Sequence, residues 1–497
     1  MKTKNKYGIV KVLLVVLLLV VIATYFIEGR QGSISYLALG DVFLNYVQSF
    51  YYFFDTAIFI FVVGGFYGAL NKVDGYKKLV KDIVEKIGDR KKLFVCIITV
   101  AFALISSLTG LNGLLLIFVP FVVSIILLLG YDKLVALSST VVAIALGFIG
   151  GIFITFKDAS NQYATTYTTF DKLVGLKKNF TNVFPTILLL VISVGLLVFY
   201  IMSHIKKVEE EEVEVDLSKK DPLFVEQKDK RGKIVKVDYS DKKAWPIALM
   251  GCILFALLVL GFMPWSSLFG IKVFTQFHKW VTKISIPKHT LFGHKFAKYS
   301  IFTGLISNSI GAFGEWNSLG NYMMAIVLIA LFIFILRFVS KVSFSDLYDG
   351  FLYGVKKMIP AVMIAMLAYS VLVCVYNSGI VETVISSVTK SYGDNVVIGS
   401  LLAVVGSILH VELYYTVAGV FSPIVSGIGT KANLSVYSVM FQSLYGLVQI
   451  FGPTSLLLIF GLSYLEVPYK NWIKYIWRFI LGLIIVIFVV LMIVSAM

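Results

Sequence analysis

His410 and Glu412 are ionisable side chains inside an apolar stretch, residues 395–427, where a membrane segment is expected. Such groups are costly inside a membrane and usually mark an ion or substrate pathway. Two positions apart, they would face different directions on a regular helix, but they could converge where the chain turns. We interpret them either as a proton-sensitive or cation-pairing site, or as solvated groups at a wet turn. Asp55, before another apolar run, is expected near an interface or as a helix cap.

Four interruptions of apolar segments supply further candidates: two turns near 109–113 and 412–419, and two helix breaks at 147–151 and 452–455. Non-helical backbone is tolerated at membrane depth only where protein covers it or where it lines a watery cavity. Opened helix ends offer N–H groups to an anion and C=O groups to a cation. The alternative is that the small residues only allow close helix packing. The candidate substrate- or ion-binding residues are Ser106, Ser107, Thr109, Gly110, Asn112, Gly147, Gly150, Gly151, His410, Glu412, Tyr415, Thr416, Gly452, Pro453, Thr454 and Ser455.

The sharpest of these signals is Gly452-Pro453, followed by Thr454 and Ser455. Proline removes a helical hydrogen-bond donor and clashes with the carbonyl one turn back. Inside an apolar helix it therefore frees carbonyl groups beside two hydroxyls.

The elements that must position these residues are membrane helices. Of the 497 residues, 58% are apolar and 14% are charged, whereas an average soluble protein has roughly 45–50% apolar and about 25% charged residues. The fold class is therefore all-α, a polytopic membrane protein. A spanning helix needs about 20 apolar residues. Such runs lie near 8–26, 43–70, 134–154, 181–203, 245–262, 319–338, 355–377, 436–463 and 476–497.

Two more apolar regions, 93–130 and 395–427, are interrupted in the middle, and each is either two short spans or one re-entrant helical hairpin. Short loops rich in lysine and arginine stay on the cytoplasmic side. Nine crossing helices with two re-entrant hairpins satisfy this rule, with the N-terminus in the cytoplasm and the C-terminus outside. The exception is the lysine-rich loop 263–300, which falls on the outer side.

The charged segment 204–243 divides the chain into two membrane halves, 1–203 and 244–497. It carries equal numbers of basic and acidic residues and few aromatic ones. Such a composition is typical of a solvated connector, here on the cytoplasmic side.

The two halves repeat the same order of elements. A shift of 305 residues (393 − 88) places Gly88 on Gly393 and Gly147 on Gly452. The interrupted regions 93–130 and 395–427 would start on opposite sides of the membrane, which predicts an inverted repeat. Inverted repeats with broken helices are the architecture of secondary transporters, whose binding site lies near mid-membrane between the repeats.

Several function classes are excluded by what the sequence lacks. It has no Walker A, HExxH, GxSxG or Rossmann pattern in a suitable context, which argues against an ATP-driven pump and against an enzyme. The basic excess, 44 Lys and Arg against 28 Asp and Glu, lies in short loops beside apolar runs, so no nucleic-acid partner is expected. The three cysteines imply neither a disulfide nor a metal site. We expect no cofactor, and Na⁺ or H⁺ as the coupling ion.

Four segments carry a family resemblance: GGFYGALNKVDG (64–75), LLLGYDKLVALSS (127–139), the stretch 349–385 and GPTSLLLIFGLSYLEVPYKNW (452–472). They resemble the YfcC-type membrane proteins of the ion transporter superfamily, relatives of the four-carbon dicarboxylate uptake carriers and of the divalent anion:sodium symporters. The resemblance implies a scaffold and a moving transport domain (an elevator-type transporter), usually a homodimer. It also implies ion-coupled transport of small organic anions or amino acids.

The resemblance carries a binding role over to Pro453, Thr454 and Ser455, which match the family pattern. Other positions depart from it. The first tip reads TGLNGLLL (109–116), without the family's acidic residues. The second reads HVELYYTVAG (410–419), in place of a tip rich in serine and glycine. The expected Asn-Pro of the first helix break is replaced by TFKDASN (155–161).

We therefore predict a secondary active transporter in the plasma membrane that moves a small organic anion, an amino acid or a short peptide by alternating access. It would be ion-coupled or an exchanger, and its partners would be this solute and the lipid bilayer. One alternative is a degenerate, transporter-like protein with a structural or regulatory role, which the altered tips would suit. Another is an intramembrane enzyme, for which the sequence shows no catalytic constellation.

Overall fold

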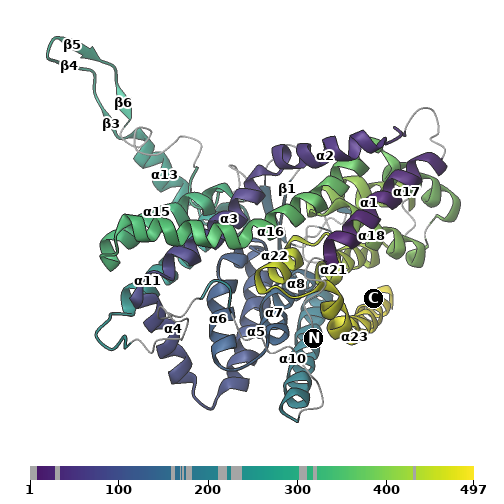
Figure 1. Cartoon of the computed structure of the whole chain (residues 1–497). Coiled ribbons are helices and arrows are strands. Elements are labelled where there is room, and N and C mark those ends of the chain that lie inside the picture. The colour runs from purple at the N-terminus through teal and green to yellow at the C-terminus, as the bar shows by residue number, and fades with distance from the viewer. Residues whose placement is uncertain are drawn as a thin grey trace.

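The computed structural model is built almost entirely of helices (Figure 1). It describes residues 8–27, 34–157, 163–167, 170, 173–174, 182–210, 221–224, 238–300, 311–316, 322–393, 395–428 and 433–496.

The helices of the first half, with the exception of the one in the lysine-rich stretch 74–87, lie in the predicted apolar runs and in the interrupted region 93–130. They are α1 (Gly8–Phe26), α2 (Leu39–Tyr52), α3 (Phe54–Leu70), α4 (Asp74–Ile87), α5 (Lys91–Thr109), α6 (Val119–Leu128), α7 (Lys133–Leu137), α8 (Ala143–Ile149) and α10 (Val183–Glu209). A 3₁₀ turn, η2 (Leu114–Ile117), precedes α6, and a π-helical turn, η3 (Ser138–Val142), joins α7 to α8.

The second half continues the helical pattern. Its helices are α11 (Trp245–Phe262), α12 (Trp265–Phe269), α13 (Val273–Lys283), α15 (Met323–Ser340), α16 (Phe344–Ser378), α17 (Ile380–Tyr392), α18 (Val396–His410), α19 (Leu413–Thr416), α20 (Ser422–Ile428), α21 (Leu434–Phe451), α22 (Leu456–Leu465) and α23 (Tyr469–Ala496). A π-helical turn, η5 (Val417–Phe421), joins α19 to α20.

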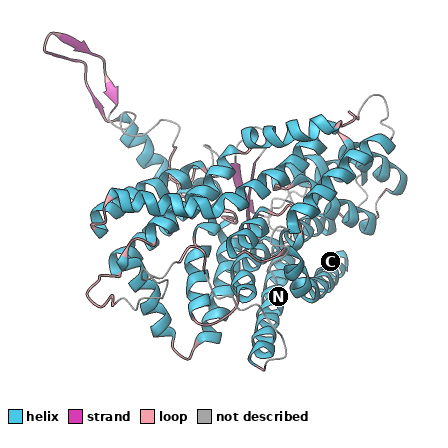
Figure 2. Cartoon of the chain, in the orientation of Figure 1, coloured by secondary structure: helices cyan, strands magenta, loops and turns pink. Residues whose placement is uncertain are grey.

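Short strands are the exception to an all-helical chain (Figure 2). They form three antiparallel pairs: β1 (Phe153–Lys157) with β2 (Tyr163–Tyr167), β3 (Ser285–Ile286) with β6 (Tyr299–Ser300), and β4 (His289–Leu291) with β5 (His294–Phe296). The predicted outer loop 263–300 holds α12, α13 and the last two pairs, and these strand pairs project away from the helical body (Figure 1).

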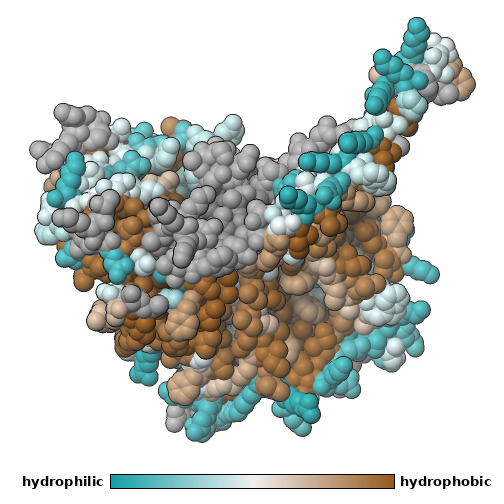
Figure 3. Space-filling view, turned by 180° about the vertical axis from the view of Figure 1, so that it is seen from behind, coloured by the Kyte–Doolittle hydropathy of each residue, from teal (hydrophilic) through white to brown (hydrophobic). Residues whose placement is uncertain are grey.

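The surface has the pattern of a membrane protein. Figure 3 shows apolar residues in a band across the middle of one face, with polar residues above and below it. In the described part of the chain, eight helices are long and apolar enough to cross a membrane, or nine if α2 and α3, bent by 65°, count as one span. The predicted runs 8–26 and 245–262 are confirmed to the residue by α1 and α11.

The longest helix, α16, crosses the interior and packs along α3. Ser343 caps its first turn, because its hydroxyl accepts a 3.0 Å hydrogen bond from the Asp346 N–H. At the crossing, a Cβ on Gly68 would lie 2.1 Å from the Gly350 carbonyl oxygen. Only glycine therefore allows the two backbones to approach this closely.

The charged linker 204–243 is not a solvated connector throughout, as the sequence suggested. Helix α10 extends into it as far as Glu209, and Lys242 and Lys243 precede α11. Residues 221–224 are folded back against the helices: Leu223 is 2% exposed and Phe224 is 7% exposed. The composition of the whole segment, with equal numbers of basic and acidic residues, hid this short stretch of Pro222, Leu223 and Phe224.

Candidate functional site

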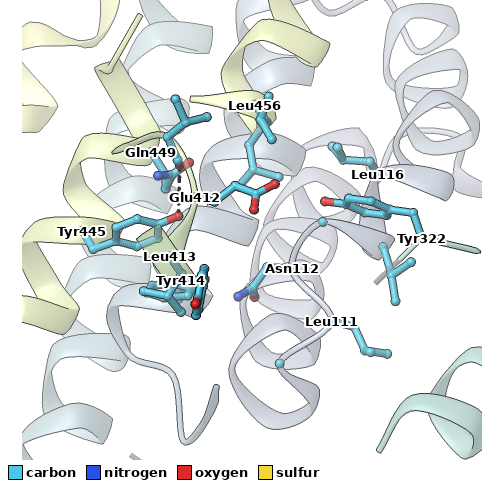
Figure 4. A pocket seen from close by; sticks show the side chains of 16 residues that line it. Leu111, Asn112, Leu116, Tyr322, Glu412, Leu413, Tyr414, Tyr445, Gln449 and Leu456 are labelled. Carbon is cyan, nitrogen blue, oxygen red and sulfur yellow. Dashed lines mark hydrogen bonds between the residues drawn. The ribbon is translucent and has the colours of Figure 1, made fainter. Parts of the chain in front are cut away.

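One cavity of about 130 Å³ lies at the predicted interruptions (Figure 4). Three of the four contribute lining residues, and the fourth, 452–455, lies in the chain between the lining residues Gln449 and Leu456. The turn after α5 and the turn after α18 face each other across it, and the end of α8, α21 and the start of α22 complete the wall. The lining residues are Gly110, Leu111, Asn112, Gly113, Leu114, Leu116, Phe148, Tyr322, Val411, Glu412, Leu413, Tyr414, Tyr445, Gln449, Leu456 and Leu457. Segments far apart in the sequence therefore form one site.

The first turn is set by Gly110, which ends α5 in the left-handed conformation with φ +67°. Glycine adopts this conformation without steric cost and commonly ends helices. Asn112 then faces the cavity, and its Oδ1 lies 2.5 Å from the Ser106 hydroxyl. The Thr109 hydroxyl donates back to the Ile105 carbonyl at 2.5 Å. Gly110 and Asn112 thus line the cavity, and Ser106 and Thr109 support the turn.

The first helix break lies directly behind this turn. The Ser107 hydroxyl donates to the Gly150 carbonyl at 2.6 Å. A Cβ on Gly147 would lie 2.4 Å from the Ala103 carbonyl oxygen, so α8 and α5 touch through backbone. These predicted residues pack the two elements together, and the neighbouring Phe148 is the one that reaches the cavity.

Gln442 closes the broken end of α8. Its Nε2 donates to the carbonyls of Ile149 and Gly151 at 3.1 and 3.0 Å. A buried carbonyl that accepts no hydrogen bond costs free energy. The side-chain amide of Gln442, on α21, therefore stabilises the broken end of α8. The sequence analysis missed Gln442, although a glutamine inside a long apolar run is a recognisable signal.

The second turn separates the two ionisable residues that the sequence placed together. Between them, Val411 has φ +58°, a conformation that β-branched residues rarely adopt. Glu412 faces the central cavity. His410 points the other way, with Nδ1 3.0 Å from the Gly406 carbonyl and its ring against Gly419. The predicted convergence of the pair is therefore not found.

His410 and Tyr415 belong to a smaller neighbouring cavity of about 30 Å³ that also contains Tyr376 and Glu382. Thr416 lies below the turn, where its hydroxyl donates to the Glu412 carbonyl at 2.8 Å. Of the predicted residues in the second tip, Glu412 alone lines the central cavity.

Glu412 is held by a chain of hydroxyl groups. Tyr369, on α16, donates its hydroxyl to the Glu412 carboxylate. Thr56, on α3, lies 3.3 Å from the same tyrosine oxygen and completes the chain. Phe53 stacks on the Tyr369 ring with centroids 3.7 Å apart. The carboxylate is thus oriented by helices that contribute no lining residue themselves.

The second helix break uses its hydroxyls on the protein itself. Thr454 donates to the Ile408 carbonyl at 2.6 Å, and Ser455 donates to the Gln449 carbonyl at 2.9 Å and caps the Leu458 N–H. Both are 1% exposed. Together with Gly452 and Pro453 they form the break, whereas Gln449, Leu456 and Leu457 line the cavity.

The cavity has one charged side chain among its described lining residues, the Glu412 carboxylate. Tyrosines 322, 414 and 445 bring rings and hydroxyls, and Figure 4 shows the Tyr322 hydroxyl directed toward Glu412. Tyr322 is fixed by stacking on Phe59, with centroids 4.3 Å apart. No sequence pattern points to Tyr322, because it lies 90 residues (412 − 322) before the turn that it faces.

The described residues contain no group of three or more His, Cys, Asp or Glu side chains that could hold a metal ion. The chemistry of the site is that of a binding pocket with one carboxylate, two amides and several aromatic rings.

A family model described as DcuC, C4-dicarboxylate anaerobic carrier, matches residues 20–496. The chain belongs to this family. The DcuC family consists of carriers and not of enzymes, so this member is a multi-pass membrane transporter. Its environment is the lipid bilayer and its cargo is a small-molecule solute.

Two solved structures are similar to this DcuC-family chain over nearly its whole length. The YdaH transporter of Alcanivorax borkumensis is 13% identical with a TM-score of 0.40, and 97% of each chain is covered. MtrF of Neisseria gonorrhoeae, described among antimetabolite efflux pumps, is 12% identical with a TM-score of 0.37, covering 97% of this chain and 94% of that chain. Comparison with curated proteins gives no match.

Proposed function

We propose that this transporter is a secondary carrier for a small solute with a protonated amine, of which a zwitterionic amino acid is the best fit. The observation that supports this is the charge of the central cavity. Glu412 is its one charged side chain among the described lining residues, and none of these residues is Lys, Arg or His.

A four-carbon dicarboxylate, named in the family description, would suit this cavity poorly. Two carboxylates about 4 Å apart repel by about 4 kcal/mol at an effective dielectric constant near 20. A dianion would also leave water without a cationic partner for either charge. An ammonium group gains from the same carboxylate, and the faces of Tyr322, Tyr414 and Tyr445 favour cations.

The carboxylate of a zwitterion also has a place in the cavity. Helix α22 begins with Leu456 at the wall, so the positive end of its dipole is directed toward the bound solute. The cavity volume of about 130 Å³ is about ten times the ~10–15 Å³ that one water needs. We infer that an amino acid binds with its ammonium at Glu412 and its carboxylate near α22.

We further propose that the two interrupted regions are re-entrant hairpins of an inverted repeat. Each half contributes one turn to the cavity wall, together with residues at or beside one helix break, which fits alternating access about a central site. In this proposal the transporter is a YfcC-type member of an elevator kind, a homodimer in the plasma membrane with its N-terminus in the cytoplasm and its C-terminus outside. Transport is coupled to Na⁺ or H⁺ or proceeds by exchange.

Counterflow in proteoliposomes tests the proposed solute class. The protein is reconstituted with unlabelled amino acids, small amines, short peptides or succinate inside, and uptake of the matching labelled solute is measured with and without a sodium or proton gradient. We expect exchange of an amino acid and none of succinate. Exchange of succinate alone would show that the carboxylate of Glu412 does not set the charge of the cargo.

A further inference from the structure

Residues 221–224, in the charged linker, form a docked segment that is hydrogen-bonded to the surrounding helices. Asp221 receives hydrogen bonds from Ser124 at 2.6 Å and from Tyr464 at 2.7 Å, and from the Leu223 N–H at 2.8 Å. Asp221 is partly buried, and Leu223 and Phe224 beside it are buried. The Phe224 ring lies 6.0 Å from the ring of Tyr76.

The docked segment joins two groups of helices. Ser124 lies on α6 and Tyr464 lies on α22, and the other ends of both helices lead to the cavity at the 114–117 turn and at Leu456. Tyr76 lies on α4, and Tyr353, on α16, donates to the Pro222 carbonyl at 3.4 Å. Neither α4 nor α16 contributes a residue to the cavity lining.

This arrangement ties α22, which lines the cavity, and α6, which follows the lining turn 114–117, to α4 and α16. The carboxylate of Asp221 holds the first group, and the Phe224 ring and the Pro222 carbonyl hold the second. If α6 and α22 move relative to α4 and α16, the segment must leave one of the two groups. Leaving the first group breaks the hydrogen bonds from Ser124 and Tyr464 to Asp221, so undocking is a distinct step.

We propose that residues 221–224 are an intramolecular latch that holds α6 and α22 against α4 and α16, and that must undock for the cavity to open further. The latch regulates access to the site. It does not depend on which solute the cavity binds, so it extends the proposed function without relying on the charge argument at Glu412.

A reversible disulfide tests the latch. In the full chain with Cys96, Cys252 and Cys374 replaced by serine, Tyr76→Cys and Phe224→Cys are introduced as a pair, and Asn112→Cys reports on the cavity. The purified protein in detergent reacts with a bulky maleimide before and after reduction, and mass spectrometry of the Asn112→Cys peptide gives the labelling rate. We expect labelling at least ~10-fold slower in the oxidised protein. Oxidised Phe224→Cys alone is the control and should label at the reduced rate.

Equal labelling of the oxidised and reduced pair would overturn the latch, since the segment would then be a fixed part of the fold. If Tyr76→Cys prevents folding, the pair Tyr353→Cys with Pro222→Cys gives the same test on α16. In the release variant, Asp221→Ala with Phe224→Ala, the Asn112→Cys thiol should react with the maleimide at least ~3-fold faster than in the protein whose latch is unmodified. Unchanged or slower labelling of a folded release variant would also overturn the proposal.

Discussion

Replacing Glu412 by glutamine removes the charge of the cavity while keeping its shape. Glutamine has nearly the same volume, and its Oε1 can still accept the hydroxyl of Tyr369. The turn at Val411 and the Thr416 hydrogen bond to the Glu412 backbone do not depend on the carboxylate. We expect a folded protein with weaker affinity for an amino acid and no loss of thermal stability.

The magnitude follows from the charge-assisted contact that is lost. A hydrogen bond to a charged group contributes about 1.5–3 kcal/mol, which corresponds to an affinity about 10- to 150-fold weaker at 1.36 kcal/mol per tenfold. The full Coulomb energy of about 4 kcal/mol is an upper bound, because both groups lose hydration when they pair. The same substitution removes repulsion, so affinity for a dicarboxylate should rise.

The assay is isothermal titration of the purified protein with the amino acid found by counterflow, and then with succinate. Glu382→Gln is the matched control, because Glu382 faces the neighbouring small cavity and not the central one. That control should bind the amino acid as the unmodified protein does. If Glu412→Gln binds the amino acid within 3-fold of the unmodified protein, the assignment of the ammonium site to Glu412 is wrong.

Three other experiments test the support of the site and the latch. Gln442→Met leaves the carbonyls at the end of α8 without a donor, so we expect a loss of about 1–3 kcal/mol in stability, seen as a lower Tm; an unchanged Tm would contradict its capping role. Gly113→Ala places a Cβ 2.4 Å from the Tyr322 hydroxyl, so the tyrosine must move and amino-acid affinity should fall, measured by titration; normal affinity would mean that Tyr322 is dispensable. Burial raises the pKa of the Asp221 carboxyl above its ordinary 3.8. Asp221 therefore binds its proton more tightly in the docked latch than in the undocked one. Docking is strongest below pH 3.8 and weakens as the pH rises through the raised pKa. Burial raises the pKa of the neighbouring Tyr76 well above its ordinary value, so labelling of Leu223→Cys, corrected for thiolate content, should accelerate with pH through Asp221 alone. Asp221→Asn should abolish that trend; a trend that persists in Asp221→Asn would belong to another group.

Local properties of the sequence determined most of the helices. A run of about 20 apolar residues needs no partner to be recognised, and α1 and α11 begin and end where the composition changes. The breaks at 147–151 and 452–455 were also predictable, because glycine and proline interrupt a helix through their own backbone geometry. So was the presence of Glu412 at a turn in an apolar region.

Only the tertiary structure decided which side chains meet. The left-handed conformation of Val411 turns His410 out of the central cavity, and no pattern in the sequence predicts positive φ at a valine. The hydroxyls of Thr454 and Ser455 pair with carbonyls of the protein, whereas Tyr322 and Gln449 reach the cavity from helices that hydropathy treats as uniform. Hydropathy and helix propensity depend on neighbours in the chain, but a cavity depends on distances between segments hundreds of residues apart, and these are set by how whole helices pack.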